Sequence, residues 1–122
     1  MTLKLSGAAA IAACTAVTSL ADAAATAGKL IVYNGVEPLD TTVPITTEVA
    51  LVEFEMGDPV FAAATDETEG GTAVANAVTP VSAVTTGTAT WFRLMDGDDT
   101  VIMQGSVAAP LGGGDITISS TE

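Results

Sequence analysis

The chain has 122 residues, enough for one domain with a modest hydrophobic core. Fifteen acidic residues against three basic ones give a net charge of −12. A basic patch that could bind nucleic acids or anionic membranes cannot form from only Lys4, Lys29 and Arg93. The sequence contains no histidine, and its single cysteine, Cys14, cannot form an intramolecular disulfide. Because histidine is the commonest general base and a usual zinc ligand, we expect no enzyme, no metal and no cofactor.

The amino-terminal segment is rich in alanine and predicts a helix over residues 6–27. Ser6 is a suitable N-cap, and Gly28 is suited to end the helix. At helical spacing one side collects small and apolar residues, and we expect this side to pack closely on the rest of the fold. Its members are Leu5, Ala9, Ala13, Ala16, Val17, Leu20 and Ala24.

Two targeting interpretations compete with the structural helix. Lys4 and the alanines are compatible with a signal peptide cleaved near residues 23–25, and residues 11–14 have the form of a lipoprotein signal ending at Cys14. Asp22 and several hydroxyl residues interrupt the apolar stretch, so the structural helix is the favoured interpretation. The sequence has no stretch that is long and apolar enough to span a bilayer.

Beyond Gly28 the pattern changes to short strands. Alternation over residues 49–56 places Glu53 and Glu55 on one face and apolar residues on the other. Pro38 and Pro44 bracket a loop, and residues 62–72 are interpreted as a solvated acidic loop. The remaining strands are predicted at 30–33, 89–95, 101–107 and 115–119, with one or two edge strands within 72–86.

These elements predict one domain over residues 1–122, with a helix at 6–27 and a β region at 29–122. The expected fold is mainly β, a small antiparallel β-sandwich or barrel with one N-terminal α-helix packed on it.

The most informative local signal is a hairpin with the acidic turn Asp96-Gly97-Asp98-Asp99. We expect Leu94 to pair with Val101 and Phe92 with Met103, which makes one face uniformly apolar. The other face is mixed and consists of Trp91, Arg93, Ile102 and Gln104. Since Trp and Arg are frequent among residues that carry binding energy, these four are candidates for protein contact. Ordinary core packing of Trp91 is the alternative.

Three other features suggest chemistry but have simpler explanations. Asp96, Asp98 and Asp99 could ligate calcium, yet the spacing is not that of an EF-hand, so a solvated turn is expected. The pair Glu53 and Glu55 is expected to face solvent. The glycines at 112–114 lack the Lys and Ser/Thr of a phosphate-binding loop and are expected to form a linker. No catalytic, cofactor or metal residue is assigned.

Several segments together resemble a family of small structural proteins of tailed bacteriophages and prophages. After the alanine-rich helix comes Lys29-Leu30-Ile31-Val32-Tyr33-Asn34-Gly35, followed by Pro38. Further along are Gly87-Thr88-Ala89-Thr90-Trp91-Phe92-Arg93, the acidic turn, and Gly105-Ser106-Val107. The resemblance covers most of the chain in order, and the Gly112-Gly113-Gly114 insertion departs from it.

The resemblance implies a capsid decoration (cement) protein on the surface of the virion head. Its partners would be the major capsid protein and copies of itself in a homo-oligomer, with neither nucleic acid nor membrane involved. Two other classes stay open: another virion component, such as a tail or head–tail connector protein, and a secreted or lipid-anchored bacterial surface protein.

Overall fold

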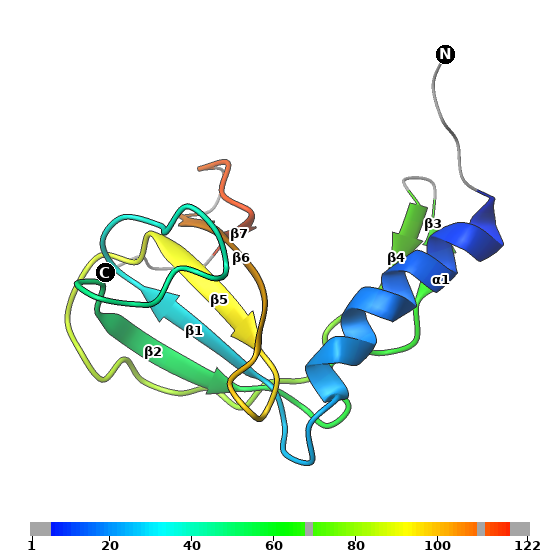
Figure 1. Cartoon of the computed structure of the whole chain (residues 1–122), viewed down its shortest axis with the longest axis horizontal. Helices are drawn as coiled ribbons and strands as arrows, with labels where there is room; N and C mark the ends of the chain where they lie inside the picture. The colour runs from blue at the N-terminus through cyan, green and yellow to red at the C-terminus, as the bar shows by residue number, and fades with distance from the viewer. Residues whose placement is uncertain (1–5, 68–69, 110–111, 118–122) are drawn as a thin grey trace.

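The computed structural model describes residues 6–67, 70–109 and 112–117. The chain begins with the helix α1 (Gly7–Thr18) and a 3-10 turn η1 (Ser19–Asp22). The strands that follow are β1 (Lys29–Tyr33), β2 (Ala50–Glu55), β3 (Thr65–Glu67), β4 (Gly70–Thr72), β5 (Trp91–Met95), β6 (Val101–Ala108) and β7 (Ile116–Thr117). Figure 1 shows a β body at one end and α1 with β3 and β4 at the other.

The β body is one curled sheet with the strand order β2-β1-β5-β6-β7. The pairs from β2 to β6 are antiparallel, whereas β7 runs parallel to β6, so the sheet is mixed. Register shifts between Val32 and Tyr33 and between Leu94 and Met95 interrupt the ladders, and such irregularities increase local twist. The prediction of a mainly β fold with one amino-terminal helix is confirmed, and the curled sheet has the form of a half-barrel.

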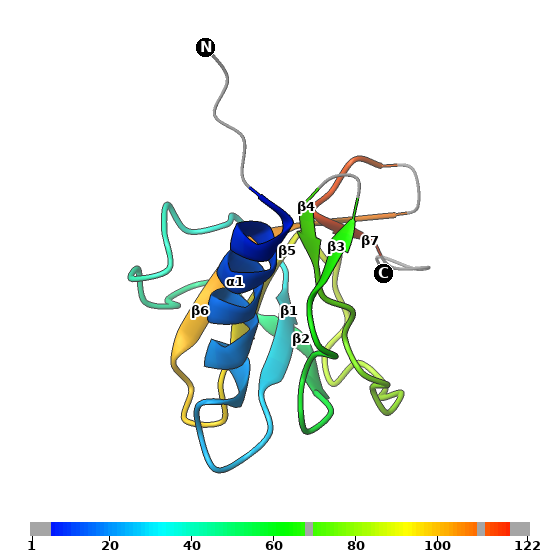
Figure 2. The same cartoon turned by 90° about the vertical axis from the view of Figure 1, so that its right-hand side faces the viewer.

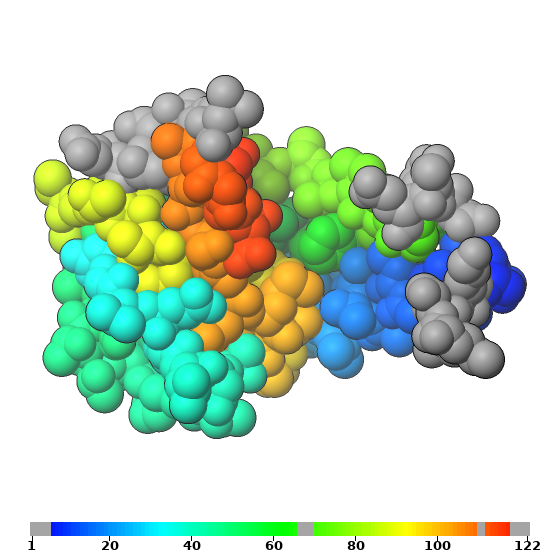
Figure 3. Space-filling model, turned by 90° about the horizontal axis from the view of Figure 1, so that it is seen from above, coloured from blue at the N-terminus to red at the C-terminus, as the bar shows by residue number. Residues whose placement is uncertain are grey.

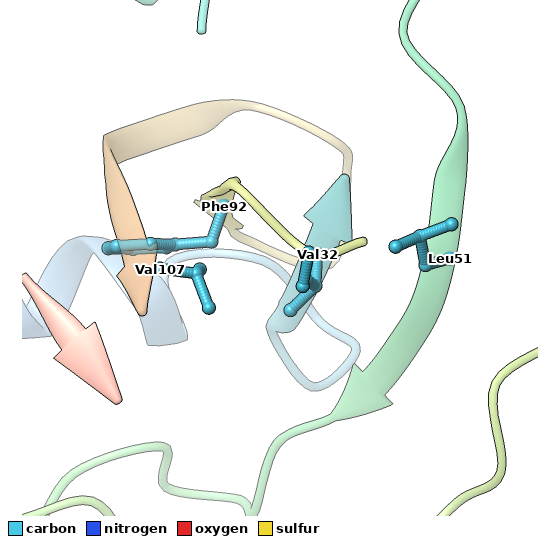
Figure 4. Close-up of a cluster of buried hydrophobic side chains, with 5 residues drawn as sticks. Val32, Leu51, Phe92 and Val107 are labelled. Atoms are coloured by element: carbon cyan, nitrogen blue, oxygen red, sulfur yellow. The ribbon is translucent and has the colours of Figure 1, made fainter. Parts of the chain in front are cut away.

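The concave side of the sheet carries the larger core cluster. Val32, Leu51, Phe92 and Val107 come from β1, β2, β5 and β6 and point toward one another (Figure 4). In a regular strand Leu51 would lie on the same face as Glu53 and point outward. It lies instead at the register shift between β1 and β2, and only 4% of its surface is exposed. Burial of each such side chain contributes about 1.5–3 kcal/mol.

A second core cluster joins the amino-terminal segment to the sheet. It contains Ala21 from η1, Met56 and Val60 from the chain after β2, and Leu94 from β5. The Asp22 side chain supports this joint, because its Oδ1 accepts a hydrogen bond from the Val60 amide at 2.8 Å. The end of the helical segment, rather than α1 itself, therefore docks on the β body.

The helix lies along the β3–β4 hairpin, and these three elements, here called the arm, project from the β body (Figures 1 and 2). The contact is close at Gly71, where a Cβ atom would come within 2.3 Å of the Ala10 carbonyl oxygen and 2.9 Å of the Cys14 Cβ. Glycine is the residue that permits this approach of hairpin to helix.

Two predictions about the helix are wrong. The α-helix ends at Thr18 and continues only as η1 to Asp22, so it does not reach residue 27. The buried side is a different, neighbouring one: Ala10 and Ala21 are buried and Cys14 is half-buried. The predicted side contains Ala9, Ala13, Ala16, Val17 and Leu20, all exposed, and half-buried Ala24, while Leu5 lies outside the described residues.

The β3–β4 hairpin occupies the segment that was interpreted as a solvated loop, residues 62–72, of which 68–69 lie outside the described part. The edge strands expected within 72–86 do not form there, apart from β4 ending at Thr72 and an isolated bridge between Phe61 and Ala75. The last strand is described at Ile116–Thr117, and residues 118–119 of the prediction lie outside the description.

Candidate functional site

The β5–β6 hairpin has a different register from the predicted one. Leu94 pairs with Met103, and Arg93 pairs with Gln104, which shifts β6 by two residues relative to the expectation. The turn accounts for one residue of the shift. The Asp96 amide donates to the Thr100 carbonyl at 3.0 Å, and Asp99 has a left-handed φ of 66°, as in a three-residue turn. A bulge at Ile102, which has no partner between the pairs Met95–Val101 and Leu94–Met103, adds the second residue.

An even shift preserves the separation of the two faces, so Phe92, Leu94 and Met103 stay on the apolar side. Ile102 does not stay with the mixed face. It lies at the bulge and packs against the second core cluster, and its placement beside Trp91 was therefore wrong.

The structure brings Trp91, Arg93 and Gln104 together and buries the first two. Trp91 is 0% exposed and Arg93 is 3% exposed, while Gln104 is half-buried. The Tyr33 ring stacks on the Trp91 ring with centroids 4.4 Å apart, and the Arg93 guanidinium carbon lies 5.4 Å from the indole centroid. Burial raises the pKa of the Tyr33 phenol. Trp91 is thus packed inside this chain, the alternative that the sequence left open.

The cover over this face is the segment between β1 and β2, residues 34–49, called the 34–49 loop (Figure 1). Its first half is held by side chains that donate to loop carbonyls. The Trp91 Nε1 donates to Asn34 O at 3.1 Å, and the Thr90 hydroxyl donates to Gly35 O at 2.7 Å. The Gln104 Nε2 donates to Pro38 O at 2.7 Å.

Arg93 holds the second half of the same loop. Its Nη2 donates to Val43 O at 2.7 Å and to Asp40 O at 3.3 Å, and its Nε donates to the Gln104 Oε1 at 3.1 Å. A planar guanidinium is suited to this task because its donors are fixed relative to one another. The one arginine of the chain therefore positions backbone instead of presenting a charge to a partner.

The loop is also closed and braced by its own residues. Asn34 N donates to Val49 O at 3.0 Å, and Val49 N donates back to the Asn34 Oδ1 at 2.9 Å. Hydrogen bonds from the Thr42 hydroxyl and amide lower the pKa of Asp40, and the Thr46 amide lowers that of Glu48. Compact loops whose ends meet are frequently functional.

The acidic turn after β5 uses its carboxylates structurally. Asp96 is buried, and its Oδ1 accepts hydrogen bonds from the amides of Asp98 and Thr100, each at 2.9 Å. Asp99 forms an ion pair with Lys29. Within residues 6–67, 70–109 and 112–117 no group of three or more His, Cys, Asp or Glu could hold a metal ion, and the lack of a calcium site stays a prediction.

No catalytic or binding role is expected for the glutamate pair on β2 or for the glycine-rich segment near the end of the chain. Glu53 and Glu55 are both exposed on β2. The segment with Gly112 and Gly114 connects β6 to β7, where Asp115 accepts hydrogen bonds from the amide and hydroxyl of Ser106 at 2.8 and 2.9 Å. Among the described helices, none is long and apolar enough to cross a membrane.

Comparison with known proteins does not extend this description: no family model, curated protein or solved structure matches the chain significantly. The relation to phage structural proteins therefore stays a prediction from the sequence.

Proposed function

We propose that the chain is a structural protein of a tailed-phage virion, a capsid decoration protein without catalytic activity. It would bind on the outside of the head, bridge neighbouring copies of the major capsid protein and oppose the internal pressure of the packaged DNA. The sequence resemblance supports the virion role. The exposed side of α1 supports action through protein contact.

The proposal rests mainly on the exposure of apolar residues on that side of the helix. Over Gly7–Thr18 the helix contains no charged residue, yet Val17 is 46% exposed and, just beyond it, Leu20 is 52% exposed. Apart from Thr15 and Thr18 the helix consists of glycine and apolar residues, and helices of such composition are normally buried, whereas the β3–β4 hairpin covers only one side of this one. Among the residues that the structure describes, no element covers the side with Val17 and Leu20, which is therefore open to a partner.

The partner of this helix side would be a second copy of the chain. Two molecules that each carry a charge of −12 repel one another, and an uncharged helix offers a surface where they can meet with the least repulsion. On a particle many copies act together, so each contact can be weak while their sum is large. The acidic remainder of the surface would keep particles apart.

We assign the β body to the small barrels rather than the sandwiches. Its sheet is curled, and β2 and β7 lie at its two ends in the strand order. The segment before β5 runs beside β2, where Val84 N donates to Leu51 O at 2.8 Å. This arrangement would leave a barrel completed by irregular chain instead of by further strands.

The test uses shells assembled from the major capsid protein encoded in the same genome, prepared without this chain. Added protein should sediment with the shells and raise their melting temperature in calorimetry. Val17→Asp should lower the occupancy of the shells, whereas Val81→Asp, at an equally exposed valine (46%), should not. A wild-type chain that ignores the shells but binds purified tails or connectors would contradict the decoration role.

A further inference from the structure

The 34–49 loop exposes large apolar side chains at its outer surface. Leu39 is 95% exposed, Val36 81% and Val43 36%. Single exposed hydrophobic residues are common, but here three fall within eight residues of one loop. Figure 3 shows this loop, in cyan to teal, as a lobe at the end of the molecule that lies away from the arm.

The same loop is held rigidly from below. The side chains of Trp91, Arg93 and Gln104 donate to its carbonyls at Asn34, Pro38, Asp40 and Val43. A loop that is already fixed loses little conformational entropy when it binds. Buried and half-buried polar side chains thus hold in place a segment whose Val36 and Leu39 side chains lie in solvent.

The charges around the apolar residues restrict the partner. Glu37 and Asp40 flank Leu39 in the loop, and both are exposed. A second copy of this chain offers little to neutralise them, because Arg93 is buried and Lys29 is paired with Asp99. Only Lys4, outside the described residues, would be left in a chain of net charge −12.

We propose that the 34–49 loop is a preformed docking element that places Leu39 and Val36 in an apolar pocket rimmed by Lys or Arg on the major capsid protein. This inference rests on the proposed function, since that function supplies the partner. It assigns the two ends of the molecule to different contacts: the loop binds the capsid protein, and the arm binds a neighbouring copy. Trp91, Arg93 and Gln104 are positioning residues that act through the loop.

The experiment measures binding of purified variants to the same decoration-free shells by cosedimentation. Val36→Asp and Leu39→Asp should each weaken binding by about tenfold or more, as loss of a central apolar anchor does. Val84→Asp is the matched control, because Val84 is also 81% exposed but lies outside the loop. Urea unfolding of each variant verifies that the fold is retained.

Salt dependence tests the basic rim. Raising NaCl from about 50 to about 500 mM should weaken binding of the wild-type chain, because ions screen the attraction. Glu37→Gln should weaken binding at low salt and flatten the salt dependence. Wild-type binding that does not change with salt would contradict the basic rim.

The outcomes separate the two proposals. If the wild-type chain does not bind shells, both proposals fail. If it binds and the two loop variants bind equally well, the decoration role stands and the loop assignment is overturned. If the loop variants and Val84→Asp lose binding to the same extent, the effect is one of added charge, and the loop assignment is again overturned.

Discussion

Arg93 and Gln104 face each other across β5 and β6, and the arginine Nε donates to the glutamine Oε1 at 3.1 Å. This bond orients both side chains toward the loop above them, where Gln104 reaches Pro38 O and Arg93 reaches Val43 O. The sheet register therefore determines where the 34–49 loop lies. A shift of β6 by one residue would move Gln104 to the other face and release the loop.

Arg93→Lys tests this connection. Lysine keeps the charge, but its single ammonium cannot reach Asp40 O, Val43 O and Gln104 in the same geometry. Because partly buried acceptors are left without donors, we expect the free energy of unfolding to fall by about 2–4 kcal/mol in urea titrations. Limited proteolysis should cut within residues 36–48 faster than in the wild type. Unchanged stability and protection would show that the guanidinium does not hold the loop.

Two substitutions at Trp91 separate its packing from its hydrogen bond. Trp91→Phe keeps an aromatic ring against Tyr33 but removes the donor to Asn34 O, and we expect a loss of about 1 kcal/mol. Trp91→Ala removes a fully buried side chain and should cost about 3–5 kcal/mol. Equilibrium unfolding of the isolated chain measures both. An alanine variant as stable as the wild type would restore the view that Trp91 serves a partner.

The features that depend on local sequence patterns could be predicted. Alternation and turn residues placed β1, β2, β5 and β6 within one or two residues at most of their ends. It also grouped Trp91, Arg93 and Gln104 on one face, because the error in register was an even number of residues.

The role of these residues was not visible in the sequence. Trp91 and Arg93 donate hydrogen bonds to backbone carbonyls of the 34–49 loop. Since every residue has a carbonyl, the residue types of the loop do not reveal these contacts. The buried side of α1 could not be predicted either, because alanine lies on both sides of the helix. The side that packs is determined by the close contact with Gly71, which is 61 residues away from Ala10 in the sequence. Two features of the sequence could have indicated the role of Arg93: a loop bracketed by Pro38 and Pro44, and a single arginine that could donate hydrogen bonds to its carbonyls.

Matched charges on the two sides of α1 test the corrected helix orientation. Ala10→Glu places a carboxylate against the β3–β4 hairpin and should destabilise the arm by about 2–4 kcal/mol through overpacking and burial of charge. Ala13→Glu lies on the exposed side and should change stability by less than about 0.5 kcal/mol. Amide hydrogen exchange across residues 7–22 reads out the arm directly. Equal protection in the two variants would contradict this orientation.

Calcium should not bind tightly to the Asp96–Asp99 turn. The Asp96 Oδ1 already accepts two backbone amides, and Asp99 is paired with Lys29, so few carboxylate oxygens are left for a cation that prefers six to eight. Calorimetric titration should show no micromolar site, with only weak general screening of the net charge. Micromolar binding that is lost in Asp98→Asn would contradict this expectation.

Acidification should release β7 before it unfolds the rest of the sheet. The amide and then the hydroxyl of Ser106 hydrogen bond to Asp115 and lower the pKa of its carboxyl. A carboxyl whose pKa is lower in the folded state than in the unfolded state contributes stability above the unfolded value, about 3.9. That contribution is lost as the pH falls from about 4 through the lower folded-state value, where protonation weakens acceptance from Ser106.

Amide exchange at Ile116 and Thr117 between about pH 3 and 6, corrected for intrinsic rates, measures this release. Asp115→Asn should reduce protection of β7 at pH 6 and abolish its specific loss on acidification. The control is Glu55→Gln, which removes one charge from exposed β2 and so relieves the overall repulsion to the same degree. It should keep the wild-type pH profile of β7. If both variants have that profile, the Asp115–Ser106 contact does not control the docking of β7.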